Sequence, residues 1–249
     1  ADEKARLIQL LDKNLRPENR EYRYNFLYNN CSTKALDKVE EALSITSDMS
    51  IAHDTCTYRS ILHRYTEPYP WLQFGIDYLL GLEADRPIGV RRQIFAPEYL
   101  MAYVDRARVA ISGVEYPYVL ETRTVAPHGE RLEVWRFPIS PVQAMVLLLL
   151  LVAVVCALEV LLERRQGWFD LLLFLVQGLM GCVVAFLFFF SEHPTVGSNL
   201  HVLYLNPLPL LLLPLLLRGV RHRSTQIAYY VLAVLLVAFI VVSLLKYQY

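Results

Sequence analysis

The residue with the clearest chemical potential is Cys31, which lies in the run NNCST at positions 29–33. Asn, Ser and Thr are the residues that most often cap a helix N-terminus, and apolar residues at helical spacing follow over residues 32–43. The run therefore predicts a helix that begins next to Cys31. Backbone N–H groups and the helix dipole at such a position stabilise a thiolate, which is the form that a nucleophilic cysteine uses.

Cys31 also has two structural interpretations. It could be a small buried side chain, or it could be the disulfide partner of Cys56, because compartments outside the cytoplasm are oxidising. The histidines nearest to it in sequence, His53 and His63, are the in-chain candidates for a general base. His53 is predicted to lie in a loop, whereas the spacing of His63 among arginines is typical of a solvated helix face.

A second group of polar residues lies in and after the segment SEHPTVGSN at positions 191–199. We expect His193, Asn199 and Asn206 near the outer surface of a bilayer, where polar groups are costly unless they are bonded or used. They are candidates to bind a phospholipid headgroup or an ester carbonyl, and the alternative is ordinary capping of two helix ends. Trp71, on a predicted helix of the polar region, is a further lipid-binding candidate.

These residues must be positioned by a chain with two contrasting parts. Residues 1–140 are charged and rich in tyrosine, whereas charged residues are few from residue 141 onward. This contrast predicts a polar domain, 1–140, joined to an all-α transmembrane domain, 141–249. Four apolar runs are long enough to cross roughly 30 Å of hydrocarbon, and they lie at 142–162, 168–190, 200–217 and 227–245.

The third run is the least regular of the four, because Pro207, Pro209 and Pro214 would kink it or break it near its start. The connections between the runs predict an orientation. Arg164 and Arg165 follow the first run and further arginines follow the third, whereas the connection at 191–199 has neither Lys nor Arg. With basic connections in the cytoplasm, the polar domain and the 191–199 connection lie outside.

The polar region is predicted to mix helices and strands. Amphipathic spacing indicates a helix over 4–15, and residues 22–28 are aromatic and predicted to be extended. Two further helices are expected to be separated around Pro68 and Pro70 and to end near Gly81. The sequence then predicts a helix over 96–111, with Pro97 in its first turn. Alternation over 114–137 predicts a β-hairpin, so the domain is predicted to be α+β.

Several stretches resemble one family closely. They are YNFLYNNCSTKALD, TYRSIL, PWLQFGIDYLLGLEADRP, IFAPEYL and SEHPTVGSNLHVLYLNPL. Together they are similar to the Lnb-type lipoprotein N-acyltransferases, a bacterial family with a periplasmic thiol domain fused to transmembrane helices. The resemblance implies a permuted papain-like, NlpC-related fold for the periplasmic domain and a multi-pass location in the inner (cytoplasmic) membrane.

The resemblance also implies roles for individual residues. Cys31 matches the catalytic nucleophile, and Asn30, Ser32, Thr33 and Asp37 match the positions that support it. Lys34 and Ala35 stand where the family often has basic residues, which leaves the Cys assignment intact. The family's catalytic His precedes the Cys, and no His precedes position 31 here. We therefore expect the periplasmic domain to be incomplete at its N-terminus, with the general base on an upstream segment or on another chain.

Three functions follow as hypotheses. The first is acyl transfer from a phospholipid, through a thioester on Cys31, to the N-terminal amine of a diacylated lipoprotein. The second is a membrane-anchored cysteine peptidase or cell-wall amidase, and the third is a non-catalytic lipoprotein-binding module in which Cys31 pairs with Cys56. Lys plus Arg equals Asp plus Glu at 24 each, and no basic stripe predicts nucleic-acid binding. We expect no cofactor and no metal.

Overall fold

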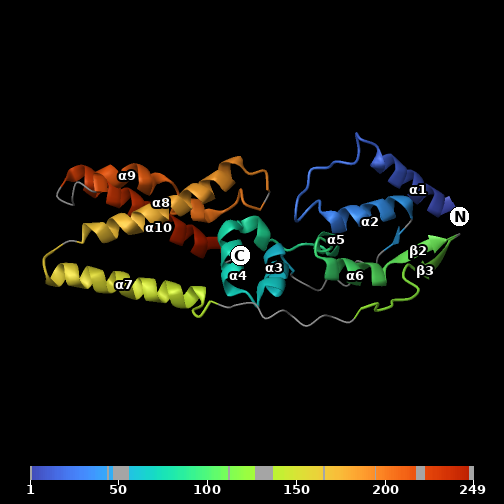
Figure 1. Ribbon diagram of the computed structural model, residues 1–249, viewed down its shortest axis with the longest axis horizontal. Coiled ribbons are helices and arrows are strands. Elements are labelled where there is room, and N and C mark those ends of the chain that lie inside the picture. The colour runs from blue at the N-terminus through green and yellow to red at the C-terminus, as the bar shows by residue number, and fades with distance from the viewer. Residues whose placement is uncertain are drawn as a thin grey trace. The chain divides into compact units, whose positions relative to one another are not determined.

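The computed structural model describes residues 2–43, 45–46, 56–111, 113–126, 137–164, 166–193, 195–216 and 222–246. The chain forms two compact units (Figure 1). The N-terminal unit comprises residues 1–62 and 86–134, and the C-terminal unit comprises residues 63–85 and 135–249. The segment 63–85, which precedes the predicted domain limit at residue 140, thus groups with the membrane-directed helices.

The N-terminal unit mixes helices with a small sheet. Its helices are α1 (Asp2–Leu15), α2 (Cys31–Ala42), α5 (Val90–Gln93) and α6 (Pro97–Arg106), and α3 (Tyr58–Thr66) begins in it. Its described strands are β1 (Ile45–Thr46), β2 (Arg108–Ile111) and β3 (Val114–Pro117), in antiparallel order β1-β2-β3. The predicted helices at 4–15 and 32–43 are confirmed to within a few residues.

A small hydrophobic cluster holds α2 against α5 and α6. Leu36 of α2, Ile94 at the end of α5 and Tyr103 of α6 are buried in it, with Ile94 fully inaccessible. The apolar face of α2 thus packs inward, and its first residue remains at the surface. Burial of such side chains is the main favourable term for a small domain.

The hairpin lies earlier in the chain than the alternation over 114–137 predicts. β2 and β3 pair from Arg108 with Pro117 to Ile111 with Val114. Gly113, with a φ of +82°, makes the turn, a conformation that glycine adopts at no steric cost. The prediction of a helix over 96–111 is wrong for residues 108–111. α6 ends at Arg106, and β-branched Val109 and Ile111 favour the strand that follows. Residues 127–136 of the predicted hairpin lie outside the described residues.

The regular elements of the C-terminal unit are all helices among its described residues. Two elements come from the segment 63–85 besides the end of α3, namely α4 (Pro70–Leu79) and the 3₁₀ helix η2 (Leu82–Asp85). The others are α7 (Pro141–Leu161), α8 (Gly167–Phe190), η3 (Leu200–Leu203), α9 (Leu208–Leu216) and α10 (Arg223–Lys246). Pro68 and Pro70 separate α3 from α4, as expected.

Among the described residues, three helices are long and apolar enough to cross a membrane: α7, α8 and α10. The third predicted run does not form one long helix. It divides into η3 and the nine-residue α9, and Pro207 and Pro209 lie at the division. Proline favours the first turn of a helix, and it has no N–H group to continue the hydrogen bonds of a preceding helix. The predicted break near its start is therefore present, and the described residues of this run do not form a helix of spanning length.

Close helix packing on α8 depends on two glycines. A Cβ placed on Gly181 would lie 2.3 Å from the backbone oxygen of Asn206, and one on Gly178 would lie 2.5 Å from Leu210 Cγ. The turn before α9 therefore rests directly on the α8 backbone. Small residues permit this close approach in membrane domains, where packing replaces the hydrophobic effect as the force between helices.

Candidate functional site

Cys31 is the first residue of α2 and is exposed. Asn30 caps the helix: its Oδ1 accepts a hydrogen bond from the Thr33 backbone N–H at 3.0 Å, and Thr33 Oγ1 accepts one from the Asn30 N–H at 2.9 Å. This reciprocal pair is a capping box. Ser32 and Thr33 are buried, so the supporting residues turn inward while the thiol faces outward.

The loop before α2 is closed by asparagine side chains. Asn25 and Asn29 exchange backbone hydrogen bonds of 3.1 and 2.8 Å, and Asn25 Oδ1 accepts from the backbone N–H groups of Leu27 and Tyr28. Residues 26–28 therefore form a turn, and the prediction of an extended segment over 22–28 is wrong for them. Asn side chains compete for backbone N–H groups in this way and favour turns.

An aromatic cluster supports this loop. Tyr58 and Phe95 are almost fully buried, with ring centroids 5.4 Å apart, and they pack edge-on against Tyr28 and Phe26, respectively. Asn30 donates a hydrogen bond from Nδ2 to the backbone oxygen of Phe95 at 2.8 Å. The residue before Cys31 is thus fixed to the core of the unit.

Asp37, one turn and a half along α2, belongs to an ion-pair network. Arg91 Nη2 lies 2.6 Å from Asp37 Oδ1 and 2.8 Å from Glu40 Oε2, and Tyr103 donates to Glu40 Oε1 at 2.9 Å. The network joins α2 to α5 and α6. Asp37 therefore holds the helix in place, which is a supporting role at a distance from the thiol.

The chemistry available at Cys31 is that of an accessible thiol at a helix N-terminus. Cys31 and Cys56 are both thiols, so the disulfide required by the non-catalytic hypothesis is not formed in the structure. The capping box occupies the N–H groups of Asn30 and Thr33. Helix geometry leaves those of Cys31 and Ser32 without intrahelical partners, so they point at the space before the helix. The N-terminal unit has two histidines, His53 and His128, and both lie outside the described residues.

His63 is not the solvated residue that its spacing suggests. Its Nε2 lies 2.7 Å from Asp77 Oδ1 and 2.9 Å from Oδ2, so α3 and α4 of the C-terminal unit are joined by an imidazole–carboxylate pair. Such a pair fixes the orientation of the ring. His63 and Asp77 are 14 residues apart and lie on two different helices, so no helical periodicity relates them. The sequence alone therefore does not predict the pair.

The polar residues of the 191–199 connection bind protein groups. Asn199 donates from Nδ2 to the backbone oxygens of Tyr78 and Leu79, and its Oδ1 caps η3 by accepting from the His201 N–H. Asn206 donates to the backbone oxygens of residues 202 and 203 and accepts from the Leu208 N–H. The capping alternative accounts for these bonds.

The connection is also joined to the end of α4 through the backbone. Gly81 N–H donates to the Thr195 oxygen at 2.7 Å, and Leu82 N–H donates to the Ser198 oxygen at 3.2 Å. A Cβ on Gly81 would lie 2.4 Å from Asn199 N, so glycine is needed for this approach. The α4–η2 segment and the connection therefore form one structure at one end of the helical unit.

His193 lies at the start of that structure. Its Nδ1 is 2.9 Å from Thr195 Oγ1, and Thr195 is fully buried. Burial lowers the pKa of His193 below its ordinary value, because an imidazolium there would lose hydration. The ring is therefore expected to be neutral near pH 7.

An aromatic cluster joins α4 to η3 and α10. The Tyr78 and His201 rings are stacked with centroids 5.6 Å apart, and Phe239 packs against both His201 and Tyr204. Burial raises the pKa of Tyr78 to about 12, and the nearby Tyr204 contributes less. The tyrosine is thus a neutral packing residue.

Trp71 occupies the other end of α4. Its Nε1 donates to the Ile139 backbone oxygen at 2.8 Å, and its ring packs edge-on against Phe74 and Phe137. These contacts fasten α4 to the segment that leads into α7. About a third of Trp71 remains exposed, on the wall of a cavity of about 730 Å³. Within the described ranges, no three His, Cys, Asp or Glu side chains are grouped to hold a metal.

Comparison with known proteins gives two matches, one for each predicted part of the chain. Residues 1–64 match the model of the Lnb N-terminal periplasmic domain, and residues 133–249 match that of the Lnb transmembrane domain. The chain belongs to the Lnb family. It is therefore a membrane protein with a periplasmic domain, and Cys31 lies inside the matched periplasmic part. Searches of curated proteins and of solved structures gave no match.

Proposed function

We propose that this Lnb-family chain is a lipoprotein N-acyltransferase of the bacterial inner membrane. The observation that carries the proposal is the exposed Cys31 thiol at the capped start of α2, within the part of the chain that matches the periplasmic domain. The donor is a phospholipid acyl ester, and the acceptor is the N-terminal amine of a diacylglyceryl-cysteine lipoprotein. The periplasmic unit is proposed to have the permuted papain-like fold that the resemblance implies.

In the first half-reaction, the Cys31 thiolate attacks the carbonyl carbon of the donor ester. The carbonyl π electrons move to oxygen, and the backbone N–H groups of Cys31 and Ser32, which the capping box does not use, are the proposed donors to that oxyanion. Collapse of the intermediate breaks the ester C–O bond, and the lysophospholipid alkoxide takes a proton as it leaves. The acyl chain remains on sulfur as a thioester.

In the second half-reaction, the uncharged α-amine of the lipoprotein attacks the thioester carbonyl. The C–S bond breaks, the thiolate is regenerated, and the amine gives up one proton as the amide forms. Dividing the transfer into two steps lets one nucleophile serve two lipid substrates in turn. His53 is the in-chain candidate for the base that handles these protons.

The membrane helices support this assignment over a peptidase acting on soluble substrates. Both proposed substrates are held in a bilayer by their acyl chains, and the described part of the chain includes three apolar helices of spanning length. Asn199 and Asn206 hold the loop at one end of these helices, and His193 and Trp71 remain the candidates there for contact with lipid.

The deciding experiment is mass spectrometry of lipoproteins from cells whose N-acylation depends on this protein. We expect Cys31→Ala to leave lipoproteins diacylated, with a free α-amine, and Cys31→Ser to do nearly the same because an alkoxide is harder to form. Cys56→Ala is the matched control and is expected to retain full N-acylation. Retained N-acylation in Cys31→Ala at equal protein level would refute the proposal.

A trapping experiment tests the intermediate itself. Denaturing the wild-type protein during turnover with a phospholipid that carries a labelled acyl chain is expected to leave the label on the Cys31 peptide. Neutral hydroxylamine should release it, because thioesters react with hydroxylamine far faster than amides do. Label on another residue, or label that resists hydroxylamine, contradicts a Cys31 thioester.

A further inference from the structure

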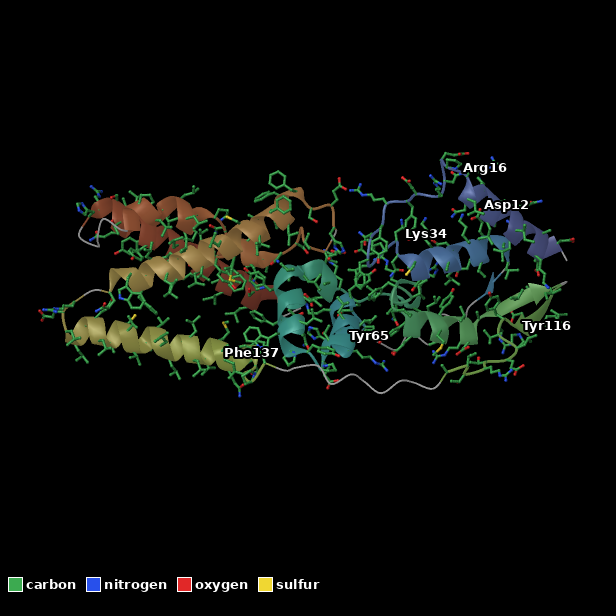
Figure 2. The ribbon with its side chains drawn as sticks, viewed as in Figure 1. Asp12, Arg16, Lys34, Tyr65, Tyr116 and Phe137 are labelled. Atoms are coloured by element: carbon green, nitrogen blue, oxygen red, sulfur yellow. The ribbon has the colours of Figure 1, made fainter. Side chains whose placement is uncertain are left out.

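The C-terminal unit contains a cavity of about 730 Å³ at the junction of α4 and α7. Its walls come from residues 67–72, at and before the start of α4, and from residues 137–143, which lead into α7. The volume falls in the range of small-molecule sites. Phe137, labelled in Figure 2, lies on the segment that enters α7.

A second, wholly apolar groove of about 280 Å³ follows along α7. It is lined by Phe74 and by residues of the first two turns of α7, down to Leu149. Trp71 lines the first cavity and packs 5.9 Å from Phe74, which lines the second, so the two spaces are neighbours. A cavity with polar lining residues and an apolar groove thus both border the start of α7, a helix long enough to cross a bilayer.

The groups that line the cavity suit a zwitterionic ligand, which carries one positive and one negative charge. Glu67 is the charged side chain among the lining residues, and the rings of Tyr69 and Trp71 lie on the same wall. A carboxylate beside aromatic faces attracts an ammonium group. Ser140 and Gln143, at the start of α7, also line the cavity, and the positive end of the helix dipole there attracts a phosphate. Their backbone N–H groups bond each other's side chains, so the Ser140 hydroxyl and the Gln143 side-chain amide are the groups that can donate to a phosphate.

We propose that this cavity binds one zwitterionic phospholipid, with the ammonium near Glu67, the phosphate near the start of α7 and an acyl chain along the groove. A diacylglyceryl-cysteine would satisfy Glu67 through its amine but has no phosphate for the helix end, so the donor lipid fits better than the acceptor. The assignment of this lipid as the acyl donor rests on the proposed function, whereas its binding does not.

The test uses the full-length Cys31→Ala protein, so that binding is measured without turnover. The protein is reconstituted in nanodiscs that contain phosphatidylethanolamine with a photoactivatable acyl chain, irradiated and mapped by peptide mass spectrometry. We expect crosslinks within residues 68–74 and 137–149. Unlabelled phosphatidylethanolamine should compete about two- to fivefold better than phosphatidylglycerol, which is the range for one exposed ion pair.

Two pairs of variants make the result specific. Glu67→Gln should abolish the headgroup preference, and Glu163→Gln, beyond the other end of α7, should leave it unchanged. Met145→Trp fills the groove and should reduce crosslinking several-fold, whereas Val154→Trp lies on α7 outside the groove and should not. Crosslinks spread evenly along α7, or stronger competition by a diacylated lipopeptide, would overturn the proposal.

The outcomes also separate this proposal from the proposed function. Crosslinking at the cavity together with normal N-acylation in Glu67→Gln would leave a lipid site that does not supply the donor. Loss of N-acylation in Cys31→Ala without crosslinking at the cavity would leave the enzyme and remove this site.

Discussion

Asn30 uses both its backbone and its side chain at the start of α2. It forms the capping box with Thr33 and donates to the backbone oxygens of Phe26 and Phe95. It is 3% exposed, so each of these groups has been removed from water and depends on its partner. The position of the Cys31 thiol therefore depends on the residue before it.

We predict that Asn30→Ala lowers the free energy of unfolding of the periplasmic unit by about 1–3 kcal/mol. The same change should slow iodoacetamide alkylation of Cys31, because the helix end that faces the thiolate loses its order. Asn19→Ala, which removes one exposed bond to the Lys13 backbone oxygen, is the control and should change stability by less than about 0.5 kcal/mol. Equal effects of the two substitutions would contradict the assigned role.

His193 makes the stability of the folded protein depend on pH. Its pKa is lowered on folding from the ordinary value of 6.5, so the unfolded chain binds the proton more readily. The associated stability is present above about pH 6.5 and is lost as the pH falls through the folded pKa. We expect the midpoint of thermal unfolding in detergent to fall between pH 7 and pH 5, and His193→Asn to reduce that decrease.

At the scale of elements, the junction between α4 and the 191–199 connection depends on one small residue. The Gly81 position would place a Cβ 2.4 Å from Asn199 N and from Ser198 C, both backbone atoms that cannot give way cheaply. The hydrogen bonds from Gly81 and Leu82 to the connection rely on that approach.

We predict that Gly81→Ala destabilises the C-terminal unit by about 2–4 kcal/mol, as overpacking against backbone does. Gly75→Ala is a matched control on α4, where an added Cβ meets nothing within 4 Å. It should be neutral or stabilise the helix by up to about 1 kcal/mol. Thermal unfolding in detergent measures both, and a harmless Gly81→Ala would show that the junction is not packed as described.

At the scale of the whole molecule, features that depend on neighbouring residues could be predicted from the sequence. Contacts between residues far apart in the chain could not. The cap at Cys31 follows from neighbouring residues, and α7, α8 and α10 follow from uninterrupted apolar runs. The bonds of Asn199 to Tyr78 and Leu79 join residues about 120 positions apart, for which one sequence has no signal. The predicted helix over 96–111 includes the residues of β2, because their short apolar run is compatible with both helical and strand periodicity.

The orientation of the chain in the membrane can be tested. The bonds between the α4–η2 segment and the 191–199 connection agree with the prediction that both lie outside. In a background with all four cysteines replaced by alanine, we expect Gly197→Cys to react with a membrane-impermeant maleimide from the periplasm. Glu163→Cys should react only after the inner membrane is opened. The reverse pattern would overturn the orientation.

The divided third run affects the lipid around it. Nine residues of α9 rise only about 14 Å, roughly half of a hydrocarbon core, and η3 adds one short turn before it. A bilayer meets such a hydrophobic mismatch by becoming thinner beside the short element. Lipids next to α9 would then stand with their ester groups displaced toward the bilayer midplane, and drawing one of them out of the membrane would cost less there than in undisturbed bilayer.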